Sequence, residues 1–170
     1  MMRLNVLRAG VVVGALLVGA CESARAPRLP DEDQVREIYT RYQDLDSVDL
    51  SGNVVELRFR QDPQALRRGG SLWAKVGPYV FLLSPATREL FTRFPDIAAV
   101  RVVTLGTGSE EVARAMLRQD AFTDIQWRRT QNILGHAIRE GSRSPSRLED
   151  LVQWGERHTE FSYNPDYVPQ

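Results

Sequence analysis

The chain contains one cysteine, Cys21, and this residue closes a short apolar run near the N-terminus. If a modification consumes Cys21, the rest of the chain holds no thiol for a disulfide or for a thiolate-bound metal. The roughly 150 residues from Cys21 onward are enough for one domain that buries about two-thirds of its unfolded surface. Such a domain needs no disulfide or metal site for stability. We therefore expect a single domain held together by a hydrophobic core.

The residues before Cys21 have the organisation of an export signal. Arg3 and Arg8 supply positive charge, and residues 9–20 are apolar and uncharged. That length is typical of a signal sequence, whereas a membrane-spanning helix needs about 20 apolar residues. Residues 16–21, LLVGAC, resemble the lipobox of bacterial lipoprotein precursors, and the resemblance covers residues 1–22. An ordinary secretory signal with a cysteine at its cut site is the alternative.

The resemblance implies cleavage before Cys21, lipidation of its thiol and attachment to a membrane. It divides the chain into a cleaved signal peptide at 1–20, a lipidated tether at 21–30 and one domain at 31–170. Each buried methylene contributes about 0.8 kcal/mol, and stable anchoring needs more than one acyl chain. Glu22 stands where inner-membrane lipoproteins of enteric bacteria often carry Asp, so the resemblance favours the outer membrane, facing the periplasm.

Charge and composition exclude some partners. The 22 basic and 22 acidic residues balance, so no overall field selects nucleic acid or an anionic membrane surface. All basic residues but Lys75 are arginines. This bias fits a GC-rich genome or a need for bidentate binding of anions.

Hydrophobic periodicity predicts alternating helices and strands in the first half of the domain. Asp31 and Gln34 fit a capping box that opens a helix. Residues 47–50 and 54–60 fit a β-hairpin with a turn at 51–53, because apolar and polar side chains alternate in the second segment. The stretch 63–95 is predicted to be helical, with a weak first part ended by Gly69-Gly70, a kink at Pro78 and two helical pieces at about 71–83 and 85–94.

The second half contains the clearest strand and one ambiguous segment. Residues 99–105 are rich in β-branched side chains, which favours a strand. Residues 110–118 fit either a returning strand or a helix that begins at Ser109, and we favour the strand. A helix is predicted from Asp120, as its cap, to Glu140, and another from Ser144 to His158. The order α-β-β-α-β-β-α-α predicts an α+β fold, with a small antiparallel sheet and helices packed on it in two layers.

Five arginines on the predicted strands are the candidate ligand-binding residues. Alternation places them on the solvent side of one sheet, where guanidinium groups would bind a phosphate, a carboxylate, a lipid headgroup or an anionic glycan. The alternative is that they are solvated and paired with neighbours such as Glu56. This predicted arginine face comprises Arg58, Arg60, Arg101, Arg114 and Arg118.

No combination of residues predicts catalysis. His136 and His158 lack the spacing of a zinc site, and structural roles are favoured for both. Asp120 and Asp124 are close enough in a helix to share a proton, but capping explains them more simply. We expect no metal and no cofactor, and we expect that the protein is not an enzyme.

Three functional hypotheses follow. The first is a membrane-tethered, non-enzymatic envelope lipoprotein that acts as an accessory or scaffold for a protein partner. The second is a tethered domain that binds a small anionic or lipidic ligand on the arginine face, and a cell-envelope hydrolase is the third and least favoured. Tyr163 and Tyr167, in the aromatic tail, are expected to strap the domain or to dock on a partner.

Overall fold

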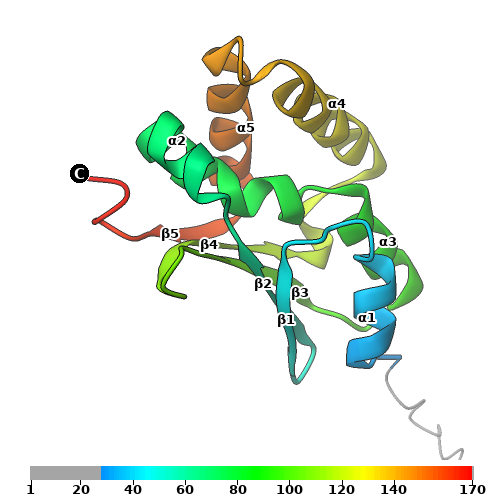
Figure 1. Ribbon diagram of the computed structural model, residues 1–170. Coiled ribbons are helices and arrows are strands. Elements are labelled where there is room, and N and C mark those ends of the chain that lie inside the picture. The colour runs from blue at the N-terminus through cyan, green and yellow to red at the C-terminus, as the bar shows by residue number, and fades with distance from the viewer. Residues whose placement is uncertain (1–27, 170) are drawn as a thin grey trace, which may run out of the picture.

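The computed structural model describes residues 28–169, which form one sheet with helices gathered on one of its faces (Figure 1). In chain order the elements are α1 (Glu32–Ile38), β1 (Leu45–Ser51), β2 (Val54–Arg60), α2 (Pro63–Leu82), α3 (Pro85–Arg93), β3 (Ala99–Leu105), β4 (Glu111–Arg118), the short 3-10 turn η1 (Gln119–Ala121), α4 (Asp124–Glu140), α5 (Pro145–His158) and β5 (Glu160–Tyr163). The α+β class expected from the sequence is confirmed.

The sheet has five strands in the order β1-β2-β3-β4-β5. The expectation of an antiparallel sheet is wrong for one pair, because β2 and β3 run parallel with Leu57 opposite Val102. A parallel pair needs a long crossover connection, and α2 and α3 supply it. The other neighbouring pairs are antiparallel, so the sheet is mixed.

Local signals placed most of the elements correctly. The capping box of Asp31 and Gln34 is present, and residues 111–118 form a strand as favoured. The non-helical break in α2 lies at Gly70, whose φ of 54° is accessible to glycine, while Pro78 sits inside the helix. One prediction is wrong: α4 is capped by Thr123, and Asp120 lies in η1. Thr123 and Gln126 form the capping box that competes with Asp120 for this role.

The core lies between the sheet and α2. α2 contacts β3 and β4, α5 packs on α2, and α4 packs on α5. Phe59 of β2 stacks on Phe81 of α2 with ring centroids 3.8 Å apart. Farther along, Trp154 of α5 is buried and its indole N–H donates to Thr130 Oγ1 at 2.8 Å. The helical layer is therefore fixed to one face, and the opposite face carries the polar side chains.

The C-terminal tail, expected to be extended, pairs as β5 with the edge of β4. The Tyr163 hydroxyl donates to Glu156 at 3.0 Å and lies 3.0 Å from the Tyr79 hydroxyl. Tyr167 donates to Glu110. These contacts confirm that the tail straps the domain. The sequence showed an extended aromatic segment but gave no register, because the partner of an edge strand is set by tertiary contacts.

The N-terminal boundary of the packed region lies slightly before the predicted one. Leu29, assigned to the tether, packs against the core, and the Arg28 amide donates to Asp96 at 2.6 Å. The predicted signal peptide and Cys21 lie outside the described residues. Within residues 28–169, no helix is both long and apolar enough to span a bilayer.

Candidate functional site

The five arginines of the predicted arginine face do gather on the side of the sheet opposite the helices. The strand register places Arg58 beside Val103, which pairs in turn with Arg114, and places Arg101 between Glu56 and Met116. Arg101 and Arg114 line a shallow hollow of about 280 Å³ together with Glu160. The alternation of side chains along β2 and β4 was enough to predict this placement.

Each of these arginines has a carboxylate partner, at a distance of 2.6–3.1 Å. The pairs are Arg58–Glu56, Arg60–Asp46, Arg101–Glu56, Arg114–Glu111 and Arg118–Asp120. An incoming anion would have to compete with these carboxylates for the guanidinium donors. The arginine face is therefore covered by a network of ion pairs and is not an open cationic surface. Ligand binding on this face stays a prediction.

Glu56 is the centre of this network of ion pairs. Its carboxylate accepts from Arg58 at 2.7 Å and from Arg101 at 3.1 Å, and its side chain is only 17% exposed. Burial acts to raise the pKa of Glu56, but the hydrogen bonds and charges of Arg101 and Arg58 outweigh it and hold the pKa below its ordinary value. Glu56 therefore remains ionised and links two strands.

The histidines have local, structural contacts. His136 Nδ1 lies 3.1 Å from Glu140 on the same exposed helix face, and His158 Nδ1 lies 2.8 Å from the Trp154 carbonyl. Asp124 pairs with Arg88 and shares no contact with Asp120. Across residues 28–169, no three potential ligands among His, Cys, Asp and Glu gather as a metal site. The hydrolase hypothesis stays a prediction with no further support here.

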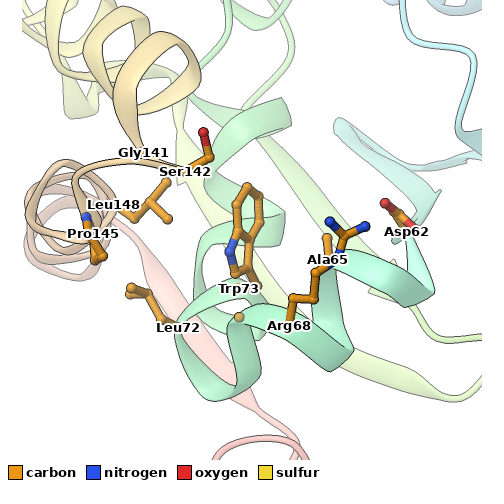
Figure 2. Close-up of a pocket in the computed structure, with 10 residues that line it drawn as sticks. Asp62, Ala65, Arg68, Leu72, Trp73, Gly141, Ser142, Pro145 and Leu148 are labelled. Carbon is orange, nitrogen blue, oxygen red and sulfur yellow. The ribbon is translucent and has the colours of Figure 1, made fainter.

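A hollow of about 590 Å³ lies between the start of α2 and the turn that joins α4 to α5 (Figure 2). Trp73 stands across its middle, with Leu148 and Ser142 on one side and Ala65 and Arg68 on the other. The break at Gly70 turns the first part of α2 relative to the rest and so shapes this wall. The sequence showed the glycine break but not the opposing turn.

A smaller cavity of about 130 Å³, here called the Gln61 pocket, adjoins this hollow and shares Asp62, Ala65 and Trp73 with it. Its walls are mostly apolar. They comprise Ala65, Leu66, Trp73, Val76, Gly77, Val80 and Phe81, with Asp44, Arg60, Gln61 and Asp62 as the polar members. The side-chain amide of Gln61 is buried beside it, and among the described residues neither its nitrogen nor its oxygen has a hydrogen-bond partner.

A third site, here called the α4–α5 groove, is a broad hollow of about 570 Å³ lined by Ile125, Gln126, Arg129, Trp154, Arg157 and His158. The guanidinium carbons of Arg129 and Arg157 lie 4.6 and 5.7 Å from the centre of the Trp154 ring. Among the described residues, neither arginine forms an ion pair. Ile125 at the rim is 71% exposed. From the sequence, Trp154 belongs to an apolar helical stripe that is most simply core, and the pair Arg128-Arg129 could reach an acidic partner, although exposed helical arginines usually have no such role. No sequence pattern assigned a role to Arg157.

Fold and sites together define an α+β domain with a five-stranded mixed sheet, an ion-paired outer face and hollows on the helical side. Comparison with protein-family models, curated proteins and solved structures finds no match.

Proposed function

We propose that this chain is a lipid-anchored protein of the bacterial cell envelope, a non-enzymatic accessory that binds a protein partner through the α4–α5 groove. The lipobox-like run at residues 16–21 supports the anchor. Arg129 and Arg157, which lie over the Trp154 ring and have no carboxylate partner among residues 28–169, are the observation that carries the binding role.

The chemistry of the groove selects an acidic partner segment with an apolar side chain. Trp154 is a fixed platform, because its ring is buried and its indole N–H is bonded to Thr130. Both guanidinium groups lie within cation–π distance of the indole, and among the described residues their only hydrogen bond is from the Arg157 Nε to the Gln153 carbonyl at 3.0 Å. Guanidinium donors that are left over can bind a carboxylate in bidentate fashion. Ile125 offers exposed apolar area beside them. Tryptophan and arginine are the residue types that most often dominate protein–protein binding energy.

Affinity purification from detergent-solubilised native membranes tests the proposal. The native chain is compared with Arg129→Glu/Arg157→Glu and with a matched control, Arg67→Glu/Arg139→Glu, which reverses two exposed helix charges outside every hollow described above. We expect a stoichiometric protein that the native chain and the control retain and the groove variant loses. Equal recovery with the groove variant, or no stoichiometric protein with any chain, would reject the groove as the docking site.

The anchor is tested separately with Cys21→Ala. This variant should accumulate as an unprocessed precursor or in the aqueous fraction, since the thiol that carries the lipid is absent. Normal processing and membrane retention of Cys21→Ala would reject the lipoprotein proposal while leaving the groove proposal standing.

A second candidate function, binding of a small anionic or lipidic ligand on the arginine face, is favoured by the hollow that Arg101 and Arg114 line. The test is binding to vesicles that contain phosphatidylglycerol. On this second candidate, Arg58→Ala/Arg114→Ala should weaken binding several-fold and leave the fold intact. Unchanged binding would reject the arginine face.

A further inference from the structure

The charge balance of the whole chain does not extend to α4. This helix and the turn after it, residues 124–143, carry four arginines but only two acidic residues. Asp124 is already paired with Arg88 at 2.9 Å. Glu140 lies 3.1 Å from His136 and 3.3 Å from Arg147. Three exposed arginines outside the α4–α5 groove form no ion pair and no side-chain hydrogen bond among residues 28–169, and they are Arg128, Arg139 and Arg143.

The helix holds these charges on its solvent side. Arg128 and Arg139 are eleven residues apart, which is close to three full turns, so they lie on the same face about 16 Å from each other along the axis. Arg139 extends back along this face, because its Nη1 lies 3.1 Å from the position of a Cβ at Gly135. The inner face of α4 is buried through Trp127 and Leu134. The arginines therefore form a row on a helix that the core keeps in place.

Exposed isoleucines flank this row. Within residues 28–169, three large hydrophobic side chains are exposed, and two of them belong to the first and last turns of α4. Ile125 is 71% exposed and Ile138 is 63% exposed. Cations beside exposed apolar side chains are typical of helices that lie on a bilayer surface, where the cations meet phosphates and the apolar groups enter the headgroup region.

The shape of the charged surface favours an extended anionic partner. Arg128, Arg139 and Arg143 line none of the hollows described above. A row of charge about 16 Å long suits a layer of phosphates better than one small anion. Guanidinium groups bind phosphate oxygens in bidentate fashion, and clusters of basic residues are attracted to membranes that contain anionic lipids.

We propose that the α4 outer surface, formed by Arg128, Arg139, Arg143 and Ile138, binds the anionic phospholipid surface of a membrane. The choice of a membrane rests on the proposed function in one respect, since the proposed lipid anchor would keep the domain beside a bilayer. One acyl chain alone gives weak attachment, and a basic surface supplies a second contact. The α4 outer surface includes neither arginine of the α4–α5 groove, so it can be tested with the groove intact.

A dye on α4 tests the contact directly. The full chain carries Cys21→Ala/Asn132→Cys, so the only thiol lies at exposed position 132, between Arg128 and Arg139, and is labelled with the environment-sensitive dye NBD. Vesicles of phosphatidylcholine are compared with vesicles that also contain phosphatidylglycerol. Residues 9–20 can hold the chain on either vesicle, but the dye responds only where α4 itself meets the headgroups. We expect a saturable rise in emission with phosphatidylglycerol, which is lost at about 1 M salt, where screening shortens to about 3 Å.

Charge-removing variants assign the response to the α4 outer surface. Each basic residue near an anionic membrane strengthens binding about fivefold, so Arg128→Gln/Arg139→Gln/Arg143→Gln should raise the lipid concentration at half-response about 100-fold. Ile138→Ser should raise it several-fold. The matched control is Arg36→Gln/Arg41→Gln/Arg67→Gln, which removes three other exposed arginines that form no ion pair among residues 28–169 and should leave the response unchanged.

The proposal fails if phosphatidylglycerol gives no response, if phosphatidylcholine gives an equal one, or if the two triple variants respond alike. A response to a single-stranded oligonucleotide but not to vesicles, lost in the α4 variant, would assign the surface to nucleic acid and overturn the proposal. These chains lack the thiol of Cys21, so none of these results decides whether the native chain is lipid-anchored. The replaced arginines are exposed, and equal urea midpoints for all chains would show that the variants are folded.

Discussion

The contact between α2 and α5 gives the sharpest prediction about stability. Gly155 of α5 faces the ring of Tyr79, and a Cβ at position 155 would lie 2.7 Å from the Tyr79 Cγ and nearer still to the ring edge. Tyr79 has no free space to move into, because it is fully buried and its hydroxyl lies 3.0 Å from that of Tyr163. The helices would have to separate to admit even one methyl group.

Gly155→Ala should therefore destabilise the domain, although alanine is the better helix former. Overpacking of a core costs about 1–3 kcal/mol, and three Tyr79 ring atoms within 2.7 Å of the added Cβ put this site in the upper part of that range, at about 2–3 kcal/mol. The gain in helix propensity returns about 1 kcal/mol. We expect a net loss of about 1–2 kcal/mol in the free energy of unfolding. With a urea slope of about 2 kcal/mol per molar, the midpoint should fall by about 0.5–1 M.

Gly135→Ala is the matched control on α4. A Cβ there would lie 3.1 Å from the exposed end of the Arg139 side chain, which can move aside. This variant should gain up to about 1 kcal/mol from helix propensity alone. A Gly155→Ala protein as stable as the native chain, measured by urea unfolding, would refute the reasoning about the α2–α5 contact.

Three further predictions concern the buried charge of Glu56 and the hydroxyl groups of Tyr79 and Tyr163. The pKa of Glu56 is lowered in the folded state, so its contribution to stability is present above the ordinary value of 4.5 and is lost as pH falls through the lower folded value. Glu56→Gln should lower the free energy of unfolding by about 1 kcal/mol at pH 7. Urea unfolding of the native chain and the variant should show this difference vanish in acid. A difference that persists well below pH 4.5 would contradict the ion-pair explanation. Burial raises the pKa of Tyr79 to about 12, so the domain should lose stability as pH rises above about 10, where the unfolded chain ionises first. Tyr163→Phe should cost about 1 kcal/mol and speed amide hydrogen exchange at residues 160–163, since β5 loses its side-chain bonds to Tyr79 and Glu156; unchanged exchange there would show that the strap does not hold the strand.

Local patterns were sufficient to predict the elements and one face of the sheet. Alternation in residues 54–60 placed Arg58 and Arg60 on the outer face, and the capping box at Asp31 marked a helix start. These signals act over a few residues, so the sequence shows them directly. The same is true of the glycine break that ends the first part of α2.

Which strands pair, and which ion pairs form between different elements, could not be predicted in the same way. The parallel alignment of β2 with β3 depends on how α2 and α3 cross the sheet, and the position of β5 depends on contacts with α2 and α5. The sequence did name Glu56 as a partner of the arginines, and Glu56 pairs with Arg58 on the same strand, whereas Asp46 reaches Arg60 only because β1 lies beside β2. The Gln61 pocket and the α4–α5 groove were missed for the same reason, because their residues meet only after α2, α4 and α5 have packed.

Site-specific photo-crosslinking in native membranes tests the central proposal most directly. A photoreactive residue is placed at Ile125, on the rim of the α4–α5 groove, and in a parallel chain at Ser47, on the outer face of the sheet. A crosslinked protein band at position 125, absent at position 47 and lost with Arg129→Glu/Arg157→Glu, is the expected result. Crosslinks that form equally at both positions, or none at position 125, would contradict a docking site in the groove.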